Sequence, residues 1–173
     1  MKIENYDQKM DFVNKNQARI EAELSEHADN FLQENFDMRL GIPIKLNGRL
    51  TRALGRFRHR AVSGSHSIEI SKIACVEALL SGNNDTLYGI LRHECIHYAL
   101  LEKGLPNDDD SPHFISSCNA LDVPLTGIVN VKQRQHHYRC AAGHSLFRAR
   151  RVNLSTHRCG CGADLEYMGQ VIR

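Results

Sequence analysis

The segment Leu91-Arg-His-Glu-Cys-Ile-His-Tyr98 contains two histidines four residues apart. Apolar residues recur around it at helical spacing, which predicts a helix over residues 86–103 with Asp85 as its N-cap. A step of four residues turns about 400° around a helix, so His93 and His97 should share one face. Both imidazoles could then bind a single metal ion.

The pattern His-Glu-x-x-His on a helix is typical of zinc peptidases. Zinc lowers the pKa of a bound water to about 7 and polarises the scissile carbonyl, while a neighbouring carboxylate takes up the proton and passes it on. Glu94 is therefore predicted to be the general base and acid. A catalytic zinc usually has three protein ligands, and His113 is predicted to be the third, because it follows an acidic loop and begins another predicted helix. The carboxylates of that loop, Asp108, Asp109 and Asp110, are the alternative.

The remaining segments before residue 132 predict an α+β domain over residues 1–131. Residues 7–40 lack proline and glycine and repeat apolar positions at helical spacing, which predicts a long amphipathic helix in one or two pieces. A small antiparallel sheet should precede the motif-bearing helix. The other expected elements are extended segments at 44–48, 50–60 and 67–71 and helices at 73–80 and 113–121.

The C-terminal segment 132–173 differs from the rest in charge and in cysteine content. It contains eight Lys and Arg against two acidic residues, a net charge of +6, whereas residues 1–131 carry −4. Three cysteines and a nearby histidine fit a tetrahedral structural zinc site, which could replace the core that about 40 residues can barely build. The predicted ligands are Cys140, His144, Cys159 and Cys161, with His157 or His137 as alternatives to His144.

The basic charge of this segment suggests that a polyanion binds at the C-terminal end. Arg148, Arg150 and Arg151 lie between the two predicted knuckles, where some of them could contact the phosphates of a nucleic acid. Tyr138 and Phe147 could either stack on unpaired bases or pack the small module. A second hypothesis is therefore a zinc-containing nucleic-acid-binding protein with latent or lost peptidase activity. It would also use the arginines Arg49, Arg52, Arg56 and Arg58 of the predicted strands.

From residue 42 to the end, the chain resembles the SprT-like family of zinc metallopeptidases. The residues that carry this resemblance are the segment 91–98, the pair His113-Phe114, the stretch from Leu46 to Arg58 with the strand that follows it, and the two knuckles. The resemblance implies a zincin-like domain whose catalytic zinc is bound by His93, His97 and His113, followed by a zinc ribbon. Because the family includes DNA-dependent proteases, it also implies protein substrates that are bound or crosslinked to DNA.

The chain departs from the family pattern in two places. Pro112-His-Phe-Ile-Ser116 stands where the family has a glycine-containing turn, which affects the expected loop geometry. The knuckles read C-x-x-x-H and C-x-C where the family usually has C-x-x-C twice, which leaves the fourth ribbon ligand less certain than the cysteines.

The sequence argues against a membrane protein. The N-terminus has no apolar signal region, and no stretch approaches the ~18 consecutive apolar residues that cross a bilayer. Without an export signal, a cytoplasmic location with reduced thiols is expected.

Overall fold

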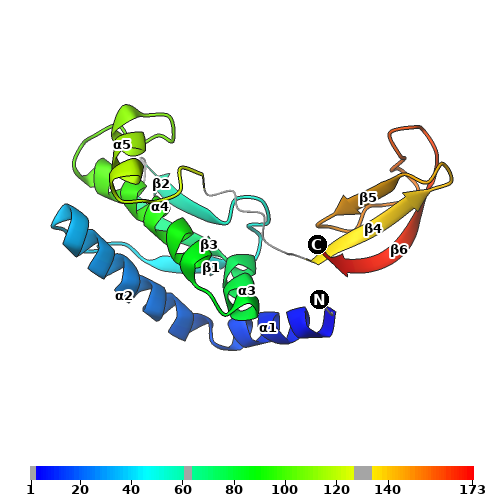
Figure 1. The fold of residues 1–173 in the computed structure, drawn as a ribbon, viewed down its shortest axis with the longest axis horizontal. Helices are drawn as coiled ribbons and strands as arrows, with labels where there is room; N and C mark the ends of the chain where they lie inside the picture. The colour runs from blue at the N-terminus through cyan, green and yellow to red at the C-terminus, as the bar shows by residue number, and fades with distance from the viewer. Residues whose placement is uncertain (1–2, 61–63, 127–133) are drawn as a thin grey trace. The chain divides into compact units, whose positions relative to one another are not determined.

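The computed structural model describes residues 3–60, 64–126 and 134–173 (Figure 1). The chain divides into two compact units, Lys9–Asn130 and Met1–Gln8 with Val131–Arg173. The predicted boundary between residues 131 and 132 lies outside the described residues. No helix in the described part of the chain is both long and apolar enough to cross a membrane. The mixture of helices and small sheets confirms the predicted α+β class.

The long N-terminal helix is present in two pieces, one of the two forms that the pattern allowed. Helix α1 (Ile3–Lys15) and helix α2 (Gln17–Phe36) are separated at Asn16, whose backbone leaves the helical region with φ −108° and ψ 19°. One face of α2 is apolar and packs into the core, which is the arrangement expected for an amphipathic helix on a globular domain. The buried residues of α2 are Leu24, Ala28, Phe31 and Leu32.

The first sheet is mixed, so the prediction of an antiparallel sheet is wrong for one strand pair. Its order is β1 (Ile44–Asn47), β3 (Ser65–Ser71), β2 (Gly55–Arg60). Strand β1 pairs with β3 in parallel, whereas β2 pairs with β3 as an antiparallel hairpin. The reason is that residues 48–54, predicted to be partly extended, instead form a connection that carries the chain past β3 to its other edge.

Each face of this sheet has its own kind of side chain, and each edge strand contacts a helix. Ile68 and Ile70 on β3 are fully buried on the apolar side. On the opposite face, Glu69 is the centre of a polar cluster that accepts hydrogen bonds from the side chains of Asn47, Arg56 and Arg58. At the β1 edge, the amide of Leu46 donates to Glu21 Oε1 on α2 at 2.7 Å. At the β2 edge, the strand packs against helix α4 (Asp85–Glu102).

Helix α4 is the centre of the first unit. It packs against α2, α3 (Lys72–Ser81), α5 (Pro112–Ala120) and the sheet, so eleven of its residues are buried. This explains why its sequence is apolar around most of its circumference. The N-cap is Asn84 rather than the predicted Asp85, which lies one position later in the first turn.

The second unit is a three-stranded antiparallel sheet of order β5 (Ser145–Arg148), β4 (Arg134–Cys140), β6 (Leu165–Ile172). Its buried core consists of Tyr138, Cys140 and Leu165, which is very small for an independent unit. Tyr138 is fully buried, and its hydroxyl accepts a hydrogen bond from the amide of Val152 at 2.9 Å. This residue therefore packs the module and is not available to stack on a base.

Candidate metal centre

His93 and His97 lie one turn apart on the buried helix α4, as their spacing predicted. Their Nε2 atoms are 3.2 Å apart. His93 is almost fully buried and His97 is partly buried. Burial also lowers the pKa of His97, which favours the neutral ring that a metal ligand requires.

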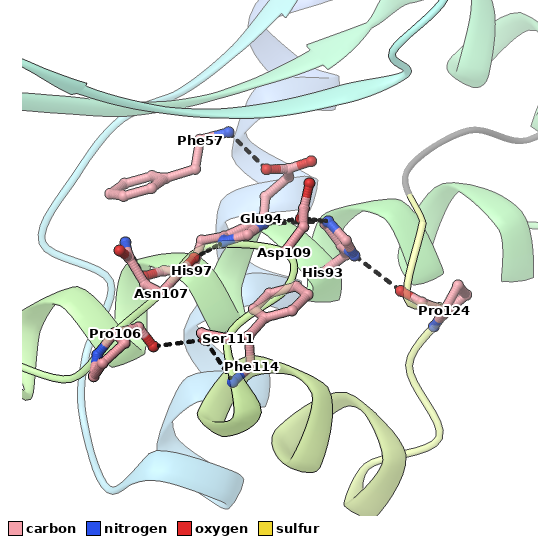
Figure 2. Close-up of polar contacts among 10 residues, drawn as sticks. All are labelled: Phe57, His93, Glu94, His97, Pro106, Asn107, Asp109, Ser111, Phe114 and Pro124. Carbon is pink, nitrogen blue, oxygen red and sulfur yellow. Dashed lines mark hydrogen bonds and ion pairs between the residues drawn. The ribbon is translucent and has the colours of Figure 1, made fainter.

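The third group that the structure brings to these histidines is Asp109, one of the three loop carboxylates considered as alternatives. Its Oδ1 lies 3.1 Å from His97 Nε2 and 3.4 Å from His93 Nε2. Figure 2 shows the three side chains converging from the helix and from the loop. His113 is an exposed residue in the first turn of α5 and is not part of this group. The structure therefore does not bring the predicted third ligand to the other two.

The path of the loop explains this difference. Ser111 is the N-cap of α5 and accepts a hydrogen bond from the amide of Phe114, while its hydroxyl donates to the carbonyl of Pro106 (Figure 2). The helix therefore begins directly after the acidic loop, with Pro112 in its first turn. Asp109 lies before this cap, on the part of the loop that passes the histidines, whereas His113 lies after it.

Two backbone carbonyls orient the histidine rings. Nδ1 of His93 lies 2.9 Å from the carbonyl oxygen of Pro124, and Nδ1 of His97 lies 2.5 Å from that of Asn107. A carbonyl can only accept, so each Nδ1 must carry the proton. This tautomer leaves the Nε2 lone pair of both rings free for a metal ion, an arrangement typical of metal-bound histidine.

Phe114 forms the floor below the two rings. It is fully buried, stacks on His97 with ring centroids 4.1 Å apart, and meets His93 edge to face at 4.9 Å. The Asn107 side chain also donates to the carbonyl of His97 at 3.3 Å. Ring packing and hydrogen bonds therefore hold both imidazoles in one orientation.

The three ligand atoms fit a small metal ion. A tetrahedral ion with ligands at about 2.0–2.1 Å places those ligands roughly 3.3–3.4 Å from one another. The three distances within the group are 3.1, 3.2 and 3.4 Å. Two imidazoles and one carboxylate also form a donor set that catalytic zinc sites use, with one position left for water or substrate.

Glu94 lies beside this group and is held by the edge strand. Its Oε2 accepts a hydrogen bond from the amide of Phe57 on β2 at 2.6 Å (Figure 2). Burial is the main cause that raises the pKa of Glu94 to about 8, and the charge of Asp109 adds to it. A buried carboxyl with a pKa in this range can both accept and release a proton near neutral pH.

These residues line an open cleft of about 580 Å³. Strand β2 forms one wall and the acidic loop forms the other, with the side chain of Asp109 74% exposed at the rim. The cleft is therefore accessible to a solute as large as a peptide segment. The residues that line it are Ala53, Gly55, Arg56, Phe57, His59, His93, Glu94, His97, Asn107, Asp108 and Asp109.

A second group of metal-ligand side chains lies in the second unit and comprises Cys140, His144, Cys159 and Cys161. His144 Nδ1 is 3.6 Å from both the Cys140 and the Cys159 sulfur, and the sulfurs of Cys140 and Cys161 are 3.9 Å apart. Zinc–sulfur bonds of about 2.3 Å in a tetrahedron separate the sulfurs by roughly 3.8 Å, so these distances fit one ion. His137 and His157, the alternatives to His144, are not in the group.

Two similar turns present these ligands. In one, the amide of Gly143 donates to the Cys140 carbonyl and the amide of Cys140 to the His144 carbonyl. In the other, the amide of Gly162 donates to the Cys159 carbonyl and the amide of Cys159 donates to the Ala163 carbonyl. The glycines have φ of 83° and 87°, a left-handed conformation that favours glycine. The hydrogen bond from the Ala163 amide, followed by that from His144, lowers the pKa of Cys161 to about 6, which favours a thiolate.

The arginines that were predicted to contact nucleic acid differ in their surroundings. Arg148, Arg150 and Arg151 are all exposed, and the guanidinium of Arg151 lies 4.8 Å from the centroid of the Tyr167 ring. Of the strand arginines, Arg56 and Arg58 both bind Glu69, so part of their charge is neutralised.

Sequence reasoning did not find the groups that orient the centre. The carbonyls of Asn107 and Pro124 and the amide of Phe57 are backbone atoms, which carry no signal in the residue type. The ring of Phe114 was visible only through the resemblance, as the residue after His113. A loop carboxylate was predicted as the alternative to His113, but nothing in the spacing indicated that Asp109 would lie beside the two histidines.

Comparison with known protein families identifies the family to which the chain belongs. The model of the SprT-like family matches residues 21–133, roughly two thirds of the chain and the part that contains His93, Glu94, His97 and Asp109. No curated protein matches the chain.

Proposed function

Because the chain belongs to the SprT-like family, we propose that it is a zinc-dependent metalloendopeptidase that hydrolyses peptide bonds in protein substrates. The observation that carries this proposal is the convergence of His93, His97 and Asp109 beside the buried carboxyl of Glu94. Two oriented imidazoles, a carboxylate and an adjacent proton acceptor are the groups that metal-assisted hydrolysis needs.

Zinc would be held by His93 Nε2, His97 Nε2 and the Asp109 carboxylate. Bound there, zinc would polarise a substrate carbonyl and lower the pKa of a water to about 7. The protein's own contribution is to keep both rings in the tautomer that leaves Nε2 free, through the carbonyls of Pro124 and Asn107. Phe114 shields the rings from solvent on the side away from the cleft.

Glu94 is proposed to take the proton from the attacking water and to pass it to the leaving amine. Its carboxyl lines the same cleft as the histidines, and the Phe57 amide holds one of its oxygens. Burial is the main cause of the raised pKa of Glu94, and a nearby positive charge would lower that pKa towards 7. A pKa close to the working pH suits a group that both accepts and donates a proton.

The substrate is proposed to lie extended along the outer edge of β2. This strand is at the edge of its sheet. The Phe57 amide donates to Glu94 and not to β3, so the backbone groups of Phe57 point away from the paired strand. Residues two positions apart share that direction, and Gly55, Phe57 and His59 all line the cleft. Pairing through backbone groups would bind a peptide segment with little demand on its sequence.

Proteins bound or crosslinked to DNA are the proposed substrates. This rests on the family resemblance and on the charge of +6 over residues 132–173. Arg148, Arg150 and Arg151 are the proposed phosphate contacts, and the second group of ligands is proposed to bind a structural zinc ion that holds their module together.

Cleavage assays test the catalytic proposal. The wild-type protein and Glu94→Gln would be loaded with zinc to the same measured content and incubated with a DNA-binding protein, with and without single-stranded DNA. Cleavage by the wild type and loss of at least about 100-fold in the variant are expected, since a general base typically contributes 10²–10⁴-fold. Full activity in Glu94→Gln would refute the mechanism.

The comparison of cleavage with and without DNA separates the peptidase hypothesis from the nucleic-acid-binding hypothesis. Faster cleavage with DNA, and a loss of that effect when Arg148, Arg150 and Arg151 are all changed to Glu, would support DNA-bound substrates. No cleavage by the zinc-loaded wild type, with salt-sensitive DNA binding retained, would favour the nucleic-acid-binding protein instead.

A further inference from the structure

Gly55, at the start of β2, is unusually close to the buried carboxyl of helix α4. A Cβ atom added at this position would lie 2.6 Å from Glu94 Oε1, 2.9 Å from Glu94 Cγ and 2.6 Å from Ile90 Cγ2. Real side chains essentially never approach so closely. The backbone of Gly55 is not left-handed, so its conformation does not require glycine. The requirement comes from the space that Glu94 and Ile90 occupy.

The close approach has a specific consequence two residues further along the strand. Because β2 can lie against α4 at Gly55, the Phe57 amide comes within 2.6 Å of Glu94 Oε2. One carboxylate oxygen therefore accepts a hydrogen bond from the strand, and the other lies against the position that has no side chain. We infer that Gly55 is a positioning residue, whose missing side chain allows the edge strand to fix the Glu94 carboxylate. This inference rests on the proposed role of Glu94 in proton transfer.

A methyl group at residue 55 would have to displace one of its neighbours. The sheet cannot easily move away, because Ile68 on the paired strand is fully buried. Ile90 is also buried, at 2% exposure. Glu94 is nearly as buried, at 4% exposure, but it lines the open cleft and Ile90 does not, so its carboxyl has space on one side into which it can be displaced. Its displacement would break the hydrogen bond to Phe57 and turn the carboxylate away from the attacking water.

Gly48→Ala is the matched control for this substitution. Gly48 is also outside the left-handed region, and a Cβ atom there would meet only the flexible side chain of Lys72, at 3.7 Å. The same chemical change is therefore made near the same sheet without contact with Glu94.

The first experiment compares the kinetics of wild type, Gly55→Ala and Gly48→Ala, each with measured zinc content. We expect Gly55→Ala to lower kcat about 100-fold, the size of effect that a displacement of about 1 Å can have, with KM and zinc content almost unchanged. Gly48→Ala should match the wild type. A kcat in Gly55→Ala equal to that of the control would overturn the inference.

The second experiment does not depend on activity. The thermal unfolding midpoints of wild type, Gly55→Ala, Glu94→Ala and the double variant form a double-mutant cycle. Gly55→Ala should lower the midpoint in the wild type but clearly less in Glu94→Ala, where two of the three crowded atoms, Oε1 and Cγ of Glu94, are gone. Equal shifts in both backgrounds would mean that the methyl group acts through Ile90 or the strand alone, which contradicts a role through Glu94.

The double-mutant cycle remains informative if a single variant fails to fold or if no activity is detected. Should Gly55→Ala fail to fold, recovery of folded protein in the double variant supports the contact, and no recovery overturns it. If the zinc-loaded wild type cleaves nothing, the proposed function fails, whereas the cycle still decides whether Gly55 and Glu94 crowd each other.

Discussion

Asp109 Oδ1 lies 3.1 Å from Nε2 of His97, although Asp109 is an exposed loop residue and His97 belongs to the central buried helix. This relationship gives the candidate centre a carboxylate where a third histidine was predicted. The hydrogen bonds of Ser111 hold the loop in the position that makes it possible.

Removal of the Asp109 carboxylate should weaken zinc binding strongly. Substitutions of groups that only orient a ligand typically cost 10–100-fold in metal affinity, so Asp109→Ala, which removes a ligand itself, should cost more than about 100-fold. His113→Ala is the control and should bind zinc like the wild type. Competition titration with a chelating dye measures both. The opposite order of affinities would restore His113 as the third ligand.

Phe114 should be one of the most costly residues to truncate. It is fully buried against both histidine rings, so Phe114→Ala should lower the free energy of unfolding by about 3–5 kcal/mol, the range for large aromatic residues in cores. Phe12→Ala, at a position that is 43% exposed, should change it by less than about 0.5 kcal/mol. Denaturant titration measures both variants, and similar values for the two would contradict the packing described.

Glu69 should make stability depend on pH in acid. Burial of this carboxyl opposes ionisation, but hydrogen bonds from Arg56, Arg58 and Asn47 outweigh it and lower the pKa of Glu69 from 4.5 to about 2. A lowered pKa in the folded state stabilises the protein above the unfolded pKa. This contribution should therefore be complete above about pH 5 and disappear as the pH falls from about 4.5 to 2.

The comparison with Glu69→Gln isolates this contribution. The difference in unfolding free energy between wild type and Glu69→Gln should shrink steadily over the same pH range, as followed by urea denaturation at several pH values. A difference that stays constant down to pH 2 would show that Glu69 titrates normally.

The second unit should depend on its metal for folding. Its apolar core is very small, so His144→Ala or a strong chelator should abolish the ordered β-sheet signals of residues 134–173 in an NMR spectrum. His157→Ala is the matched control, because His157 is exposed and lies outside the ligand group. Loss of order in His157→Ala, with His144→Ala unaffected, would assign the fourth ligand to the other histidine.

The sequence by itself determined the features that depend on local periodicity. The spacing of His93 and His97 was enough to place both rings on one helix face, because a helix returns to the same direction after four residues. The helical N-terminal segment, the approximate places of the later helices and the ligand-rich turns of the second unit followed in the same way from apolar spacing, glycines and cysteines, whereas the split at Asn16 was left open by the pattern.

Tertiary structure decided the features in which distant backbone segments meet. The convergence of Asp109 rather than His113 on the two histidines depends on how the loop passes α4 before α5 begins, whereas the sequence favoured His113 over the loop carboxylates. The parallel pairing of β1 with β3 depends on the path of residues 48–54. Neither has a periodic signature, because a loop path is set by contacts between residues far apart in the chain.

The same reason explains why the setting of Glu94 was not visible. The Glu94 carboxylate accepts a hydrogen bond from a backbone amide, and it fits beside the strand because the residue next to it has no side chain. Residue types identify the groups that perform chemistry, but Phe57 and Gly55 contribute only through the position of their backbone. That position exists only once the edge strand has packed against the helix.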